Sequence, residues 1–218
     1  MQCKITPSVM TCDLLNFEKE LYDLQEAGID WIHFDLMDGK YVKNLGLAPQ
    51  MVSKIKEKFP KIIIDLHCMV NDIENIQDIL KDGDYVTIHF SSKQKSSLEE
   101  IYNNLKVNGL KVGLAIDLDD KFDDYEKYLE IVDLVTVMSI RPGFAGSSFE
   151  QKAWTTIERL ANLKIEKNFL IQIDGGVREN NIYKLAENQV DLIVVGSWLF
   201  GEQDYKNRVS NFYMKVNY

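Results

Sequence analysis

Short apolar runs rich in β-branched residues recur along the chain and alternate with segments of helical periodicity. Eight of these runs are predicted strands, at residues 3–10, 31–37, 61–69, 85–90, 111–118, 134–140, 168–174 and 191–197. Between them, residues 16–28 place Phe17, Leu21 and Leu24 on one helical face, and residues 147–163 show similar spacing. Several strands are apolar at nearly every position, which is typical of a parallel sheet covered by helices.

Alternation of strand and helix predicts an α/β fold, with residues 1–218 forming one (β/α)8 TIM barrel. A doubly wound dinucleotide-binding sheet is less well supported, because no G-x-G-x-x-G follows the first strand. The densest charged stretch, residues 117–130, is predicted to be a solvated surface helix. Since active sites of such barrels lie at the carboxyl ends of the strands, polar residues late in each strand are the candidates for chemistry.

Charge and cysteine content narrow the possible partners. A net charge of -9 and a pI near 4.9 argue against nucleic-acid binding through bulk electrostatics, but leave a small anionic ligand open. Three cysteines without CxxC spacing indicate a reduced, cytoplasmic protein. No signal peptide is apparent and no apolar run approaches the ~20 residues that span a bilayer, so no membrane partner is expected.

The stretch IHFDLMDG, residues 32–39, sets a carboxylate inside an apolar strand, which is costly unless the charge is paired or bound to a metal. Residues two apart in a strand share a face. Three predicted strands therefore present grouped side chains: His33, Asp35 and Met37; Asp65, His67 and Met69; Gln172 and Asp174.

Two histidines and two aspartates, His33, Asp35, His67 and Asp174, make a candidate site for one divalent ion such as Zn²⁺, Fe²⁺, Mn²⁺ or Co²⁺. The ion would offset the desolvation of the carboxylates, polarise a substrate oxygen and stabilise an enediolate. Asp35 and Asp174 could then act as base and acid on opposite sides of one carbon. The alternative for either histidine alone is a hydrogen-bonded core residue.

Other polar and methionine residues have competing interpretations. Asp65 falls earlier in its strand, so a structural pairing is expected, and Asp38 before Gly39 is expected in a turn. His89 ends the fourth strand and could support the site or contact the substrate. Three methionines at strand ends are either core filler or an apolar wall around the reacting carbon: Met37, Met69 and Met138.

Glycine-bearing turns follow the last three strands, as RPGFAG at residues 141–146, DGG at residues 174–176 and GS at residues 196–197. Glycine lets backbone N–H groups approach a ligand closely, and the last loops of such barrels often hold phosphate. These turns together indicate a phosphate site.

Seven segments resemble, in order and spacing, the ribulose-phosphate 3-epimerase family: PSVMTCDL, GIDWIHFDLMDGKYVKNL, DLHCMV, VTIHF, VTVMSIRPGFAGSSF, IDGGVREN and VVGSWLF. The resemblance extends from about residue 5 to residue 200. It implies a (β/α)8 barrel of the ribulose-phosphate-binding type that epimerises a ketose phosphate at C3 through an enediolate. It also implies one divalent metal, two catalytic aspartates and a homo-oligomer.

By this resemblance, Asp35 and Asp174 would be the acid/base pair, and with His33 and His67 they would hold the metal. The remaining family positions concern the substrate. Ser8 and His67 would contact the substrate, and Met37, Met69 and Met138 would line the intermediate. The substrate phosphate would rest on Gly146, Gly175, Gly176, Gly196 and Ser197, with Gly143 supporting the loop.

The substrate-facing loops depart from the usual family pattern. GKYVKN stands where GHFVPN is usual, and GFAGS, containing Ala145, stands where GFGGQ is usual. Arg141 and Trp198 are also atypical and are expected to influence substrate preference. Ala145 resembles the branch acting on allulose 6-phosphate, whereas DGG resembles the ribulose-phosphate branch.

The first hypothesis is therefore interconversion of D-ribulose 5-phosphate and D-xylulose 5-phosphate. The alternatives are a D-allulose-6-phosphate 3-epimerase, which forms fructose 6-phosphate, and a non-catalytic sugar-phosphate-binding relative. Other phosphate-binding barrels are a weaker possibility, because they give no reason for the two histidines and two aspartates.

Overall fold

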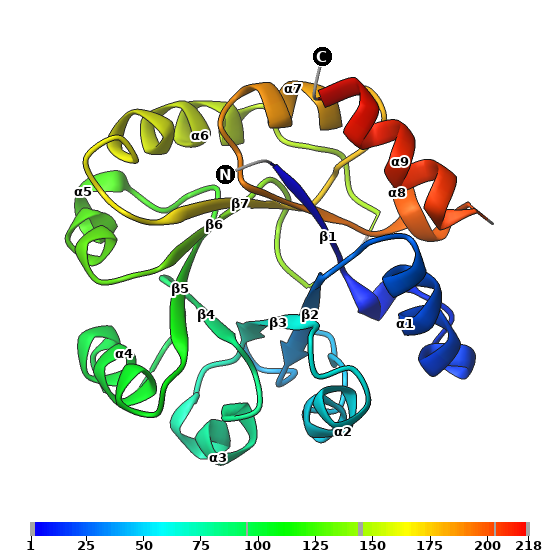
Figure 1. The fold of residues 1–218 in the computed structure, drawn as a ribbon. Coiled ribbons are helices and arrows are strands. Elements are labelled where there is room, and N and C mark those ends of the chain that lie inside the picture. Colours follow the sequence, from blue (N-terminus) through cyan, green and yellow to red (C-terminus); the bar gives the residue numbers. More distant parts are fainter. Residues whose placement is uncertain (1–2, 95, 144–145, 203, 217–218) are drawn as a thin grey trace.

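The computed structural model describes residues 3–94, 96–143, 146–202 and 204–216. Eight parallel strands curl into a barrel with helices around it (Figure 1). The strands are β1 (Lys4–Pro7), β2 (Trp31–Met37), β3 (Ile63–Met69), β4 (Tyr85–His89), β5 (Lys111–Ile116), β6 (Leu134–Met138), β7 (Leu170–Asp174) and β8 (Leu192–Val195). The predicted TIM barrel is thus confirmed.

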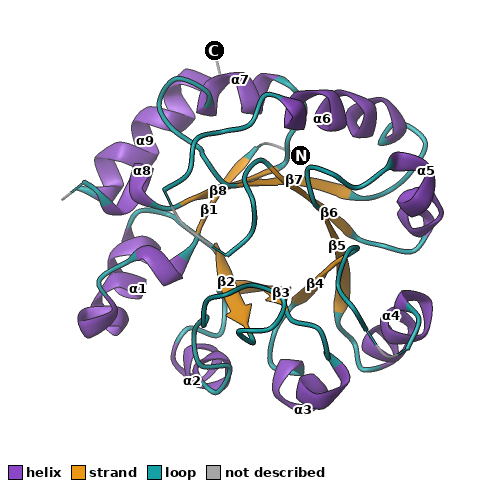
Figure 2. Cartoon of the chain, turned by 180° about the vertical axis from the view of Figure 1, so that it is seen from behind, coloured by secondary structure: helices purple, strands orange, loops and turns teal. Residues whose placement is uncertain are grey.

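Helices follow the strands and form the outer ring that Figure 2 shows from behind. The α-helices are α1 (Phe17–Glu26), α2 (Met51–Lys58), α3 (Gln77–Leu80), α4 (Leu98–Val107), α5 (Phe122–Tyr125), α6 (Lys152–Leu163), α7 (Ile182–Glu187), α8 (Ser197–Phe200) and α9 (Tyr205–Val216). The 3-10 helices are η1 (Val9–Thr11), η2 (Leu14–Asn16), η3 (Glu74–Ile76) and η4 (Glu126–Glu130). In the described part of the chain, no helix has both the length and the apolar character that crossing a bilayer needs.

The sheet has the strand order β1-β8-β7-β6-β5-β4-β3-β2, and a parallel ladder joins each strand to the next one in this order. The remaining edges, β1 and β2, meet through a parallel bridge between Ser8 and His33. This bridge brings the end of β1 beside the middle of β2, where the candidate metal ligands begin.

Two of the predicted helical segments differ from the structure in their bounds. The segment predicted at residues 147–163 becomes helical only at Lys152, because the preceding residues run as a loop whose Glu150 N–H donates to the Ser139 carbonyl (2.8 Å). The charged stretch at residues 117–130 folds into two short surface helices, α5 and η4, rather than one.

Polar and apolar layers fill the barrel at different depths. Four side chains form an apolar cluster at the amino-terminal end: Trp31, Tyr85, Leu134 and Leu192. Further along the strands the buried interior is polar and includes Asp65, Thr87 and Gln172. Gly113 makes room for this layer, because a Cβ there would lie 2.4 Å from Thr87 Oγ1. The polar interior therefore leads toward the carboxyl ends of the strands.

Candidate active site

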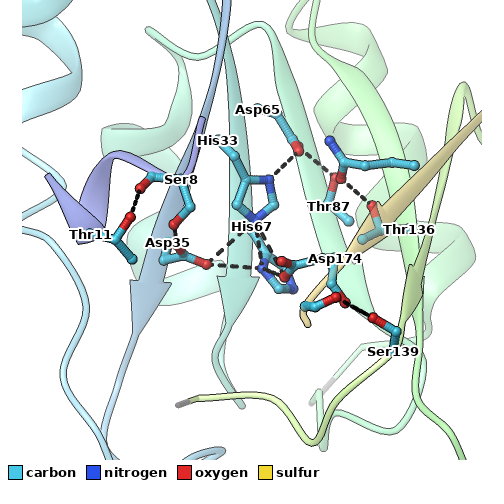
Figure 3. A network of polar contacts seen from close by, with 12 residues as sticks. Ser8, Thr11, His33, Asp35, Asp65, His67, Thr87, Thr136, Ser139 and Asp174 are labelled. Atoms are coloured by element: carbon cyan, nitrogen blue, oxygen red, sulfur yellow. Dashed lines mark hydrogen bonds and ion pairs between the residues drawn. The ribbon is translucent and has the colours of Figure 1, made fainter. Parts of the chain in front are cut away.

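Four ionisable side chains converge inside the barrel: His33 and Asp35 on β2, His67 on β3 and Asp174 at the end of β7 (Figure 3). His33 Nε2 lies 3.0 Å from His67 Nδ1, and Asp35 Oδ1 lies 3.2 Å from the same Nδ1 atom. Asp174 Oδ2 lies 3.7 Å from His33 Nε2 and 3.5 Å from His67 Nδ1. One ligand atom from each residue falls within 4.8 Å of all the others.

Alternation along the strands explains this convergence. His33 and Asp35 are two residues apart and point to the same side, and the β2–β3 register sets His67 directly opposite Asp35. Asp174 closes the group from β7, and Figure 3 shows the two aspartates approaching the histidine pair from opposite sides. The carboxylate in IHFDLMDG therefore faces polar groups rather than the apolar core outside the sheet.

His33 is oriented by a carboxylate behind it. Its Nδ1 lies 2.9 Å from Asp65 Oδ2, and the Thr87 hydroxyl donates to Asp65 Oδ1 over 2.8 Å. Both histidine and carboxylate are fully buried. Since an ionised carboxylate only accepts, Nδ1 carries a proton and Nε2 faces the cluster. The expected structural pairing of Asp65 is confirmed.

The pKa values of the two catalytic candidates, Asp35 and Asp174, are shifted in opposite directions. Burial raises the pKa of Asp174 above its usual value, although the nearby histidines oppose this shift. Burial acts in the same direction on Asp35, but the charge of His33 and the hydrogen bond from His33 hold the pKa of Asp35 well below the usual range. Burial opposes protonation of His33, yet Asp35 and Asp65 raise the pKa of His33 well above its usual value. Two carboxylates with opposed shifts are typical of acid/base pairs.

The donor set fits a divalent cation. Two imidazole nitrogens and two carboxylate oxygens suit Zn²⁺, Fe²⁺, Mn²⁺ or Co²⁺, and two carboxylates held this close together favour a cation between them. His33 Nε2, Asp35 Oδ1, His67 Nδ1 and Asp174 Oδ2 are the atoms that could hold it. The Asp65–His33 pair is the kind of outer support that metal-ligating histidines have.

A cavity of about 260 Å³ opens above this cluster. It brings together most of the residues that the sequence predicted for the substrate: Ser8, Met37, Met69, Met138, Gly143, Gly146, Gly175, Gly176, Gly196 and Ser197. Asp35 and Asp174 also line it, whereas His67 is fully buried behind them. The Ser8 hydroxyl donates to Asp35 Oδ2 over 2.7 Å.

Comparison with known proteins agrees with this geometry. A sequence profile of the ribulose-phosphate 3-epimerase family matches residues 4–200. This chain belongs to the ribulose-phosphate 3-epimerase family. It is 32% identical to the chloroplastic ribulose-5-phosphate-3-epimerase of Arabidopsis thaliana over 94% of this chain and 74% of the relative. It is 29% identical to the ribulose-phosphate 3-epimerase of Escherichia coli K12 over 94% of this chain and 92% of the relative.

Solved structures of lower sequence similarity share the fold of this family member. The KGPDC of Streptococcus mutans superposes with a TM-score of 0.69 at 12% identity, covering 100% of this chain and 98% of that chain. The 3-hexulose-6-phosphate synthase of Salmonella typhimurium gives a TM-score of 0.68 at 16% identity, covering 98% of each chain. These likenesses concern the barrel alone.

The sequence pattern did not indicate several other residues that line the cavity of this epimerase-family protein: Met10, Thr11, Ile140, Pro142, Val177, Arg178 and Val194. Arg178 is the cationic side chain of the described lining, and its Nη1 donates to the Val177 carbonyl over 2.7 Å. Its position two residues after the DGG turn is the signal that could have identified it.

Two residues expected to influence substrate preference do not line the cavity. Arg141 is exposed on the loop after β6. Trp198 is buried in α8, where its Nε1 donates to Glu179 Oε2 (3.0 Å) and the Arg208 guanidinium covers its ring. The expectation that these two side chains select the substrate is therefore not supported. Ala145, the other departure from the family pattern, lies outside the described residues.

The two remaining polar predictions are resolved by contacts. His89 does not line the cavity; its Nε2 lies 2.7 Å from His67 Nε2, which favours a supporting role over substrate contact. Asp38 lies in a turn, where its Oδ1 accepts from the backbone N–H groups of Lys40 and Tyr41, as the sequence predicted.

Proposed function

We propose that this protein interconverts D-ribulose 5-phosphate and D-xylulose 5-phosphate by moving the proton on C3 of the sugar. The observation that carries this proposal is the joint position of Asp35 and Asp174, which line one cavity and share a cluster with two histidines. Inverting a carbon by proton transfer needs one group to remove the proton on one face and another to return it on the opposite face.

Asp35 and Asp174 are the proposed acid/base pair. One carboxylate takes the C3 proton and the protonated partner delivers a proton to the other face, and the roles exchange in the reverse direction. Ser8 restrains Asp35 through its Oδ2 atom, which leaves Oδ1 directed toward His67. A divalent metal held by His33, Asp35, His67 and Asp174 would polarise the ketose oxygen and stabilise the charge of an enediolate.

Three methionines in the lining, Met37, Met69 and Met138, are proposed to cover the reacting carbon. Their thioethers neither donate nor accept protons strongly, so the enediolate would exchange protons only with the two aspartates. His67 contributes behind them as a ligand, so it affects the substrate through the metal.

The phosphate group of the substrate is proposed to bind at the glycine-bearing turns after β6, β7 and β8. Backbone N–H groups near Gly146, Gly175, Gly176, Gly196 and Ser197 offer donors there, with Gly143 supporting the loop. Arg178 adds a positive charge to a protein whose net charge is -9.

We further propose that residues 1–218 act as one barrel domain in the cytoplasm and assemble as a homo-oligomer. The thiols of Cys3, Cys12 and Cys68 are free, which suits a reducing compartment. The oligomer is proposed from the family resemblance.

The test follows the C3 proton directly. Ribulose 5-phosphate and allulose 6-phosphate are offered separately in D₂O with Mn²⁺-loaded or Zn²⁺-loaded protein, and proton NMR records loss of the C3 signal and appearance of the epimer. We expect rapid exchange with ribulose 5-phosphate. Preference for allulose 6-phosphate would replace the pentose assignment, and binding without exchange of either sugar would indicate a binding-only relative.

Two variants test the acid/base assignment in the same assay. Asp35→Asn and Asp174→Asn should each lower turnover by about 10²–10⁴-fold, because an amide cannot take up the proton. Asp119→Asn is the matched control, since this aspartate is exposed and contacts only Lys152 among the described interactions. Near-normal turnover in either active-site variant would contradict the pair.

A further inference from the structure

His67 continues into a second line of hydrogen bonds that leads away from the cluster. Its Nε2 lies 2.7 Å from His89 Nε2, and His89 Nδ1 lies 3.0 Å from Asp117 Oδ1. The planes of the two rings are inclined by 26°, and their centroids are 4.9 Å apart. His33, His67 and His89 are the three histidines of the chain, so all of its imidazoles belong to one connected network.

Asp117, the last residue in this line of hydrogen bonds, determines which ring nitrogens of His89 and His67 carry a proton. Burial would raise the pKa of Asp117, but hydrogen bonds from His89, Ser91 and Tyr41 lower it to about 2, so Asp117 is an ionised acceptor. His89 must then donate from Nδ1, and in the neutral ring its Nε2 is an acceptor. His67 donates to it from Nε2, which leaves the lone pair of His67 Nδ1 directed at the cluster.

Asp117 is itself fixed from several sides. It follows β5, and its Oδ2 accepts from the Tyr41 hydroxyl (2.6 Å) and from the Ser91 hydroxyl. Its backbone N–H donates to Asp120 Oδ2 over 2.7 Å. The two hydroxyl contacts to Oδ2 hold the carboxylate so that its other oxygen, Oδ1, faces His89.

We propose that His89 and Asp117 are positioning residues that fix the His67 tautomer, so that Nδ1 is free to bind the divalent metal. Asp65 performs the same task for His33 in a single step. The relay through His89 extends this support from β3 across β4 to the end of β5. This inference rests on the proposed metal site, but the tautomer can be measured without the metal.

The first test uses the metal-free wild-type protein. Long-range ¹H–¹⁵N spectra of histidine-labelled protein report which ring nitrogen of each of the three histidines carries a proton, with assignments made by single substitutions. We expect His67 protonated on Nε2 and His89 protonated on Nδ1. A His67 ring protonated on Nδ1 would overturn the proposal, because that proton would block the proposed ligand atom.

The second test measures metal affinity rather than turnover. His89→Phe removes the acceptor for His67 Nε2–H and should weaken Mn²⁺ or Zn²⁺ binding by about 10–100-fold in a chelator competition. His89→Gln can offer a carbonyl oxygen to the same N–H and should recover much of the affinity. Asp119→Asn, on the adjacent exposed surface, should bind metal like wild type.

These measurements distinguish the possible failures. Equal metal affinity in wild type, His89→Phe and His89→Gln would exclude the positioning role even if the enzyme epimerises ribulose 5-phosphate. If wild type binds no metal, the proposed function fails, and the tautomer spectrum still decides whether the relay orders His67. Equal weakening in both His89 variants would mean that packing, not the acceptor, matters, and would also overturn the proposal.

Discussion

Asp35 lies in a strand whose other residues, apart from His33, are apolar, and an isolated carboxylate there would be strongly destabilising. Its neighbours account for its burial, because Ser8 donates to one oxygen while the rings of His33 and His67 lie beside the other. Among the residues that the structure describes, Asp174 has no comparable set of donors, which explains why burial raises its pKa while that of Asp35 is lowered. Two residues of one type thus acquire different proton affinities from their surroundings.

Arg178 provides a prediction for a single side chain. Arg178→Ala should raise KM for ribulose 5-phosphate about tenfold with little change in kcat, because it removes a charged donor near the phosphate but leaves the aspartates intact. Steady-state kinetics of the two variants Arg178→Ala and Arg141→Ala provide the measurement. Arg141 is exposed outside the cavity and should have no effect. An unchanged KM in Arg178→Ala would exclude its role in phosphate binding.

The strand elements were predictable because their signal is local. Alternation placed His33 with Asp35, and the eight apolar runs lie within a few residues of the observed strands. The helix predicted from residue 147 began too early because Phe149 fits a helical apolar face, yet it packs on the Trp154 ring and beside Gly176. Periodicity does not distinguish an apolar residue on a helix from one that anchors a loop.

The residues that the sequence did not predict for the site depend on contacts between elements far apart in the chain. The link from His67 to Asp117 depends on the register of β3, β4 and β5, which sets residues far apart in sequence side by side. Arg178 enters the cavity from a loop rather than from a strand, so the period-2 argument did not reach it. The ligand cluster was predictable from sequence because its members are polar residues within or at the end of apolar strands, whereas the residues that support them were not.

The turn after β7 provides a prediction at the scale of elements. Gly176 has φ +58°, and a Cβ there would lie 2.4 Å from the Phe149 backbone nitrogen in the loop after β6. Gly176→Ala should cost about 1–2 kcal/mol for the left-handed backbone and a further 1–3 kcal/mol for the clash. It should also raise KM, because the two loops that it separates carry the proposed phosphate site.

Gly109 is the matched control for this prediction. Its φ is +82°, and a Cβ there would have nothing within 4 Å, so Gly109→Ala isolates the backbone cost. Urea unfolding gives both free energies and steady-state kinetics give both KM values. Equal destabilisation of the two variants would show that the loop after β6 yields to the extra methyl group without cost.

At the scale of the whole molecule, the cluster joins parts of the barrel that the sheet does not pair directly. β2 and β3 are neighbours, but β7 is separated from β2 by β8 and β1, and in the described part of the chain one bridge, Ser8–His33, joins β1 to β2. The side chains of the cluster span this edge from inside. A cation shared by them would therefore tie the least hydrogen-bonded part of the ring together.

Metal binding should consequently stabilise the fold. At a free Mn²⁺ concentration of about 100 times Kd, the free energy of unfolding should rise by about 2.7 kcal/mol, which corresponds to a Tm increase of roughly 5–10 °C. Mn²⁺ is preferred to Zn²⁺ here because it binds weakly to the three cysteine thiols of the unfolded chain. Thermal unfolding of EDTA-treated and Mn²⁺-loaded protein measures the shift. Asp174→Asn should lose most of it and Asp119→Asn should retain it, whereas an undiminished shift in Asp174→Asn would locate the stabilising ion away from the four-residue cluster.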